Sequence, residues 1–152
     1  EPPTVVIDNG TGYTKMGYAG NMDPSYIIPS TIATSLNKVS ILFLSNLSRK
    51  TPSLSPPVRL LHRRRSHGAL KDTSNIVLAQ GGQIEDWEGI EKFWHKSIYS
   101  YLRCEPEEHR FILTEPPLNS PENREQMAEI MFETFGVKGL FIGVQATLAL
   151  YS

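Results

Sequence analysis

The stretch VVIDNGTGYTKMGYAG, residues 5–20, decides the fold. It begins with apolar β-forming residues, turns at a glycine-rich segment and continues into a second β-forming run that contains one lysine. An Asn-Gly pair between two such runs favours a β-hairpin, because glycine tolerates the positive φ that tight hairpin turns require. We therefore expect two paired strands joined at residues 9–12, followed by a turn at 21–24 and a short strand at 26–29.

The tip of this hairpin has the composition of an anion site. Backbone N–H groups in a turn form a concave donor surface, and glycines let a phosphate approach without meeting a Cβ atom. The predicted donors are Gly10, Thr11, Gly12 and Tyr13. Lys15 adds a positive charge, and Asp8 is suited to a hydrated divalent cation, because hard cations prefer carboxylates and water. Taken alone, the pattern fits a phosphate loop and a plain glycine hairpin about equally well.

Composition and charge exclude several classes of protein. The 152 residues are 39% hydrophobic and 20% charged, which is enough for one domain with a hydrophobic core, and the net charge of -1 gives no general reason to expect nucleic acid as a partner. The single cysteine, Cys104, excludes an internal disulfide framework and favours the cytoplasm. No apolar run approaches the ~20 residues that span a bilayer, so we expect no membrane segment.

The chain divides into three parts that differ in composition. Residues 1–36 form the hairpin part with the predicted phosphate loop. Residues 37–80 are rich in serine, proline and arginine and lack periodicity, which is typical of a loop-rich insert or an altered small subdomain. The cluster Arg63–Arg65 in this part has the charge to contact nucleic acid, but a solvated loop is the interpretation we favour. Residues 81–152 form the third part.

Clear helix and strand patterns return in the third part. Apolar residues at helical spacing follow a capping residue at Asp86 and again at Ser120, and Gly136 is placed to end the second helix. The predicted elements are helices at 87–103, at 120–136 and from 145, and strands at 110–115 and 138–144. Helices that alternate with strands at this spacing indicate an α/β domain.

Two long collinear blocks carry a family resemblance. Residues 5–34, and residues 82–152 with the motifs LTEPPLN, ENRE and IMFETF, resemble the N-terminal portion of the actin superfamily, and most of all the type three class of actin-related proteins. The resemblance implies an actin-like (ribonuclease H-like) α/β ATPase fold, of which this chain supplies an incomplete N-terminal half domain.

The resemblance also implies a site for ATP or ADP with Mg²⁺ in a cleft between two α/β domains. Its first phosphate loop falls on residues 8–15, where Asp8 acts on the metal through water and Lys15 and the loop amides hold the phosphates. A glutamine in the position of Gln145 orients the attacking water. The family's second phosphate loop and adenosine pocket lie outside the matched residues. We therefore expect little nucleotide binding by this chain alone, and at most slow regulatory hydrolysis in its full-length relative.

The resemblance implies an ATP-binding subunit of the branched-actin nucleating complex, in truncated form, located in the cytoplasm with the actin cytoskeleton. Its expected partners are the other subunits of that complex and actin. Two alternatives stay open. One is a conventional actin-like filament protein or a non-functional truncated product, because the ending LALYS is closer to conventional actin. The other is a different ATPase or kinase of the same superfamily, for which the chain has no sugar-binding or peptide-binding signature.

Overall fold

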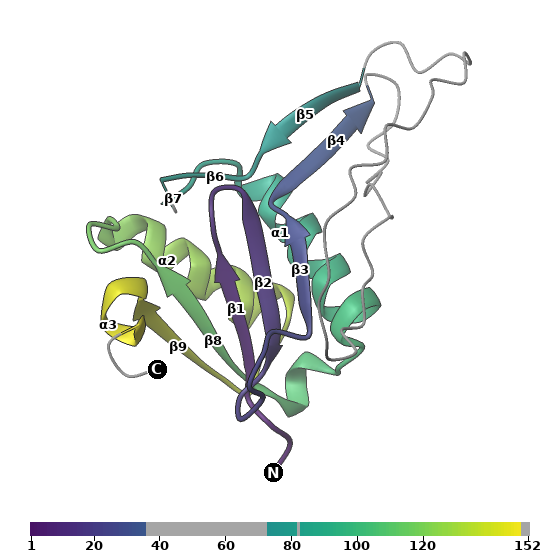
Figure 1. Ribbon diagram of the computed structural model, residues 1–152, viewed down its shortest axis with the longest axis vertical. Helices are drawn as coiled ribbons and strands as arrows, with labels where there is room; N and C mark the ends of the chain where they lie inside the picture. The colour runs from purple at the N-terminus through teal and green to yellow at the C-terminus, as the bar shows by residue number, and fades with distance from the viewer. Residues whose placement is uncertain (36–72, 82, 150–152) are drawn as a thin grey trace, which may run out of the picture.

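The computed structural model describes residues 1–35, 73–81 and 83–149. At its centre is one five-stranded mixed sheet in the order β3-β2-β1-β8-β9 (Figure 1). The strands are β1 (Val5–Asn9), β2 (Tyr13–Tyr18), β3 (Tyr26–Pro29), β8 (Arg110–Glu115) and β9 (Gly139–Val144). Strands from the two ends of the described sequence therefore share a single sheet.

The predicted hairpin is confirmed, but the reason for its glycine is different. β1 and β2 pair antiparallel, with Asn9 opposite Thr14 at the tip. Among the described glycines, positive φ occurs at residues 20, 81 and 136, and so not at Gly10. A Cβ atom on Gly10 would lie 2.6 Å from the carbonyl oxygen of Tyr13. Glycine is therefore needed here because the backbone passes too close for a side chain, not because of a left-handed conformation.

Two strand pairs lie beyond the central sheet. β4 (Thr31–Ser35) pairs antiparallel with β5 (Thr73–Val77), and β6 (Ala79–Gln80) pairs with β7 (Gln83–Ile84). In Figure 1 the β4 and β5 pair projects away from the central sheet.

Within residues 37–80, for which the sequence predicts a loop-rich insert or an altered small subdomain, the described residues 73–80 contain the strands β5 and β6. The run TSNIV in β5 contains serine and asparagine, which are common in turns, and its strand character comes from the pairing with β4. Its neighbours Leu78 and Ala79 are buried, at 0% and 1% exposure. The rest of the predicted insert, including Arg63–Arg65, lies outside the described residues.

The first predicted helix is confirmed with a change of geometry at its end. α1 (Trp87–Lys96) begins at Asp86, whose Oδ1 accepts a hydrogen bond from the N–H of Gly89 at 3.0 Å. The helix continues as a π-helical segment, Ser97–Leu102, and ends where Arg103 adopts a left-handed φ of 55°. The predicted cap is therefore used as expected.

The second predicted helix is also confirmed. α2 (Pro121–Glu129) starts at Ser120, whose hydroxyl oxygen accepts a hydrogen bond from the N–H of Asn123 at 3.2 Å. A π-helical segment, Ile130–Thr134, follows, and Gly136 has the positive φ of 61° that ends many helices.

The remaining helical segments are short. A single 3₁₀ turn, Pro106–Glu108, precedes β8, and α3 (Gln145–Ala149) follows β9 directly, as predicted. Across the described residues, no helix combines the length and the apolar character needed to cross a membrane.

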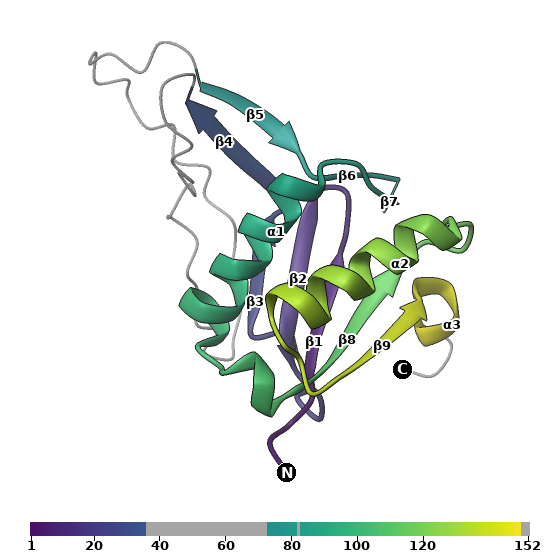
Figure 2. The same ribbon diagram turned by 180° about the vertical axis from the view of Figure 1, so that it is seen from behind.

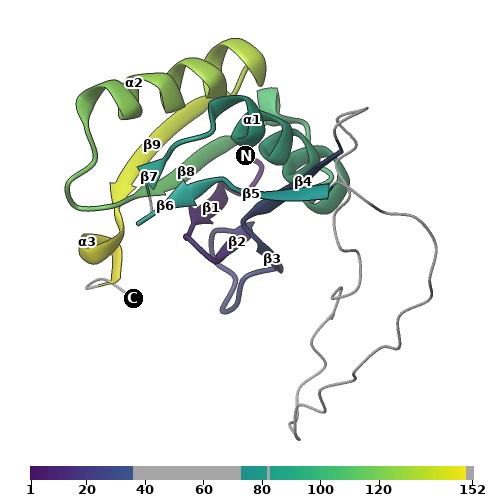
Figure 3. The same cartoon turned by 90° about the horizontal axis from the view of Figure 1, so that it is seen from above.

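The core lies between one face of the sheet and the two longer helices. Figure 2 shows α1 and α2 over this face, and Figure 3 shows α3 on the opposite side. Side chains from both layers are almost fully buried; they include Val5, Ile7, Phe111 and Leu113 from the sheet and Ile90, Phe93, Trp94, Met127, Met131 and Phe135 from the helical segments. Burial of apolar surface at ~25 cal/mol per Å² is the main force that holds the layers together.

One buried polar contact ties α1 to the hairpin. The indole Nε1 of Trp94 donates a hydrogen bond to Oδ1 of Asn9 at 3.2 Å, and the two residues are 0% and 2% exposed. Asn9 is the last residue of β1, so this contact fixes the end of the strand from beneath.

We expect Trp94→Phe to destabilise the protein more than Trp87→Phe, a half-buried tryptophan on the same helix. Loss of the indole N–H leaves a buried oxygen of Asn9 without its donor, which costs ~1–3 kcal/mol in addition to the lost packing. Urea unfolding followed by circular dichroism measures both free energies. Equal losses for the two variants would contradict the role assigned to this hydrogen bond.

Candidate functional site

Three parallel strand ends meet at one edge of the sheet. β1 pairs parallel with β8, and β8 pairs parallel with β9. Asp8 and Thr114 are each the second-to-last residue of their strands, and Gln145 directly follows β9. Because Ile7 is level with Leu113, the residues that follow these two lie side by side. Ligand sites in α/β sheets form at such carboxyl ends.

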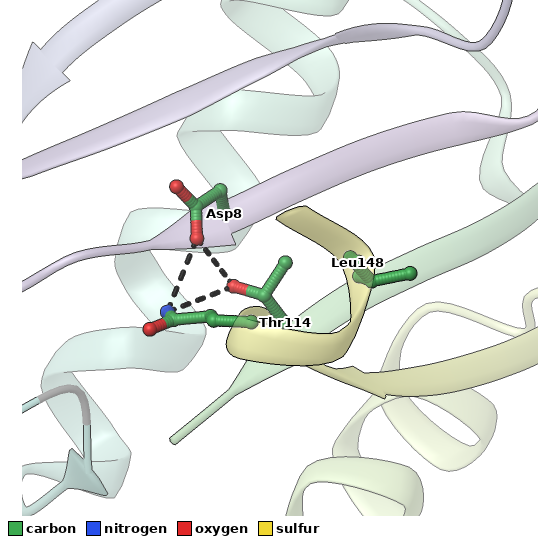
Figure 4. Close-up of a pocket in the computed structure, with 4 residues that line it drawn as sticks. Asp8, Thr114 and Leu148 are labelled. Carbon is green, nitrogen blue, oxygen red and sulfur yellow. Dashed lines mark hydrogen bonds between the residues drawn. The ribbon is translucent and has the colours of Figure 1, made fainter. Parts of the chain in front are cut away.

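The three side chains form a closed hydrogen-bonded network (Figure 4). The hydroxyl of Thr114 donates to Oδ1 of Asp8 at 2.5 Å. The amide Nε2 of Gln145 donates to the same Oδ1 and to Oγ1 of Thr114, both at 3.2 Å. Thr114 is only 8% exposed, so this network is largely shielded from solvent on its strand side.

The second carboxylate oxygen of Asp8 faces a lysine. Asp8 and Lys15 are direct cross-strand partners in the hairpin, and Nζ of Lys15 lies 3.4 Å from Oδ2. The side chains of Lys15 and Asp8 are 53% and 28% exposed, so this ion pair remains open to water and adds little to stability by itself. The carboxylate therefore has one oxygen held by the network and one turned toward a cation.

A cavity of about 310 Å³ opens beside the network. It is lined by Asp8, Thr114, Gln145 and Leu148, so that Leu148 supplies its apolar wall (Figure 4). A Cβ atom on Gly143 would lie 2.8 Å from Cδ1 of Leu148. Glycine at this position therefore lets α3 turn back closely over β9 and bring Leu148 to the cavity.

The glycine-rich turn differs in part from the concave surface of backbone N–H donors that the sequence predicts. The N–H of Gly10 donates to the carbonyl of Asp8 at 3.1 Å and is thus engaged within the turn. The carbonyl of Gly12 accepts a hydrogen bond from the N–H of Ser30 at 3.0 Å, which fixes the far side of the turn. A Cβ atom on Gly12 would meet no atom within 4 Å, and Thr11 is exposed beside it. The surface at Gly12 is therefore open, and the phosphate contact expected there stays a prediction.

The donor groups suit a hydrated divalent cation with an anion. The described residues contain no cluster of three or more His, Cys, Asp or Glu side chains that could enclose a metal. Asp8 offers a carboxylate at the cavity, and Lys15 offers an ammonium group beside it. Mg²⁺ usually keeps several waters and binds through one or two carboxylates plus phosphate oxygens, so a single carboxylate fits that chemistry.

Next to Thr114, the buried carboxylate of Glu115 forms an ion pair with the half-exposed Arg124. Glu115 is 1% exposed and accepts hydrogen bonds from Arg124, at 3.1 Å from its Nε, and from Nδ2 of Asn119 at 3.0 Å. Burial raises the pKa of Glu115, but the hydrogen bonds from Arg124 and Asn119 outweigh it and hold the pKa below its ordinary value. This pair fastens the loop after β8 to α2 and so supports the strand end that carries Thr114.

Sequence reasoning identified some of these residues and missed others. The structure places Lys15 and Gln145 beside the carboxylate of Asp8, whereas Thr114 and Leu148 were not among the predicted site residues. One signal was available for Thr114, since it occupies the polar position near the carboxyl end of a predicted buried strand. Nothing in the local sequence points to Leu148, because its role depends on how α3 folds back.

The Glu115 ion pair should make stability depend on pH. A carboxyl with a lowered pKa in the folded state stabilises the protein above its unfolded pKa of ~4.3, and this contribution is lost as the pH falls through the folded pKa. We expect Glu115→Gln to be less stable than wild type at pH 7, with a difference that shrinks as the pH falls below ~4.3. Thermal unfolding at several pH values measures this.

The exposed Glu125 on α2, the helix that carries Arg124, provides the control. Glu125→Gln should change stability little across the same pH series, because exposed charges contribute little. A loss in Glu115→Gln that stayed constant from pH 7 to acid pH would contradict the assigned ion pair.

Comparison with known proteins extends the resemblance to the whole chain. A family model described as Actin matches residues 1–152. The protein named Actin-related protein 3 from Dictyostelium discoideum is 54% identical over 148 residues, which cover 97% of this chain and 34% of that protein. Those of the same name from Acanthamoeba castellanii and Caenorhabditis elegans are each 48% identical, over 97% of this chain and 35% of their own lengths.

The chain thus spans about a third of the length of the curated relatives it matches. The predicted resemblance to the type three class is confirmed by their shared name, and the predicted actin-like α/β fold class is confirmed by the family match and by the mixed sheet with its helices. This chain belongs to the actin family.

Proposed function

We propose that this chain forms the first phosphate and metal site of an ATP-binding actin-related protein. The observation that carries the proposal is the network of Asp8, Thr114 and Gln145 beside the open turn at Gly12. In this proposal Lys15 and the N–H groups of the turn hold phosphate oxygens, while Asp8 binds Mg²⁺ through water. The expected N–H donors are those of Thr11, Gly12 and Tyr13. The N–H of Gly10 is set apart because it donates to the carbonyl of Asp8 within the turn.

Gln145 takes the role of orienting water in this proposal. Its Nε2 donates to Asp8 and Thr114. The amide oxygen is the acceptor atom of a glutamine side chain, so in this proposal it accepts a hydrogen bond from a water molecule. ATP, when bound, supplies the γ-phosphate that water attacks. Because Gln145 is an orienting group and not a strong base, the arrangement favours slow, regulatory hydrolysis.

The names of the relatives support a cytoskeletal role. Proteins called Actin-related protein 3 match this chain at 48–54% identity in three organisms. We propose that the complete gene product is a cytoplasmic subunit of the branched-actin nucleating complex, with actin and the other subunits as its partners. Affinity purification from the source cells followed by mass spectrometry distinguishes this from the alternatives. Complex subunits support the proposal, whereas actin filaments alone, or no partner, contradict it.

Lys15→Ala in the complete gene product should weaken MgATP binding by about tenfold or more. A hydrogen bond to a charged group contributes ~1.5–3 kcal/mol, and ~1.4 kcal/mol corresponds to a factor of ten in Kd. Isothermal titration calorimetry at ~0.1 M salt measures the affinity. Lys138→Ala serves as the control, because Lys138 is a similarly exposed lysine before the amino end of β9, at the far end of that strand from Gln145.

The two lysine variants remove the same charge and differ in position. We expect Lys138→Ala to bind MgATP as wild type does, since long-range charge effects are screened within ~10 Å at 0.1 M salt. If both variants lost the same affinity, net charge and not the hairpin would be responsible. If Lys15→Ala bound MgATP with unchanged affinity, the phosphate-loop assignment would be wrong.

A further inference from the structure

The hydroxyl of Thr114 has only one hydrogen-bonding arrangement that satisfies its neighbours. An ionised Asp8 carboxylate can only accept, so the single hydroxyl proton of Thr114 points to Oδ1 of Asp8. The hydroxyl oxygen is then an acceptor, and the group of Gln145 that faces it must be the donor Nε2. The direction of every hydrogen bond in the network therefore follows from the charge on Asp8.

This polarity fixes which way the Gln145 amide faces. Nε2 lies 3.2 Å from both Oδ1 of Asp8 and Oγ1 of Thr114, so one N–H of the amide is shared between these two acceptors, and the amide oxygen is held on the other side of the group. Without the hydroxyl of Thr114, one of the two acceptors for Nε2 is lost. The present orientation of the Gln145 amide is then less stabilised. Rotation about χ3 exchanges the positions of its oxygen and nitrogen atoms.

We propose that Thr114 is a positioning residue: its hydroxyl sets the orientation of the Gln145 amide. This inference rests on the proposed function, in which the amide oxygen of Gln145 must be available to water. Thr114 is suited to the role because it is 8% exposed, lies on a central strand and contacts both groups directly. The adjacent Glu115 ion pair holds the same strand end to α2.

Nuclear magnetic resonance of the nucleotide-free chain tests the positioning role without relying on activity. The side-chain amide signals of Gln145 are assigned by their loss in Gln145→Ala. In Thr114→Val, which keeps the shape and removes the hydroxyl, we expect these signals to shift and their exchange with water to rise about two- to tenfold, as loss of one hydrogen bond of ~0.5–1.5 kcal/mol implies. Thr114→Ser restores a hydroxyl and should restore the wild-type signals.

Thr14→Val is the matched control for a purely structural effect. Thr14 is 1% exposed on the same sheet, and its hydroxyl bonds to that of Ser30 at 2.8 Å on the other side of the hairpin. This variant also removes a buried threonine hydroxyl, but it should leave the Gln145 signals unchanged. Unchanged Gln145 signals in Thr114→Val, or a Thr114→Ser variant that behaves like Thr114→Val, would overturn the proposal.

A second measurement separates this inference from the proposed function. In the complete gene product, Thr114→Val should lower the ATP hydrolysis rate about tenfold with little change in MgATP affinity, because Lys15 and the turn are untouched. Combining it with Gln145→Ala should cause no further loss, since Thr114 acts through Gln145. Absence of MgATP binding by wild type would refute the proposed function, whereas additive losses in the double variant would refute the positioning role alone.

Discussion

The parallel pairing of β1, β8 and β9 is the constraint on which the rest of the structure depends. Parallel strands carry their carboxyl ends to the same edge, so residues that are more than a hundred positions apart in the chain become neighbours there. Parallel connections need long crossovers, and here α1 and α2 provide them while covering one face of the sheet. The site exists because Asp8, Thr114 and Gln145 each stand at such an end.

At the hairpin tip, the side chains on the two faces of the sheet have different roles. On the helix side, Asn9 is held by Trp94, and Thr14 is held by Ser30, both in buried contacts. On the other side, Asp8 lines the cavity and Lys15 beside it is half exposed to water. Since side chains alternate along a strand, one short hairpin can anchor itself in the core and present charged groups to a ligand at successive positions.

The sequence predicted the elements of the fold well, and the contacts between distant elements less well. The hairpin, both helix caps and the strand at 110–115 follow from local patterns, and the structure has them. β5 escaped prediction because its strand character depends on a partner in β4. The engaged N–H of Gly10 and the role of Thr114 depend on distances within a turn and across a sheet. Local periodicity carries no information on either.

The charges of the site favour a ligand that carries both signs. Asp8 and Lys15 neutralise each other at 3.4 Å, so a cation alone meets the repulsion of the lysine, and an anion alone meets that of the carboxylate. A metal ion bound to phosphate presents a positive part to Asp8 and a negative part to Lys15, and thereby replaces one ion pair with two. The half-exposed position of Lys15 leaves its side chain free to turn away from Asp8 without loss of packing. This charge pattern supports the proposed function, because MgATP carries both a metal ion and phosphate.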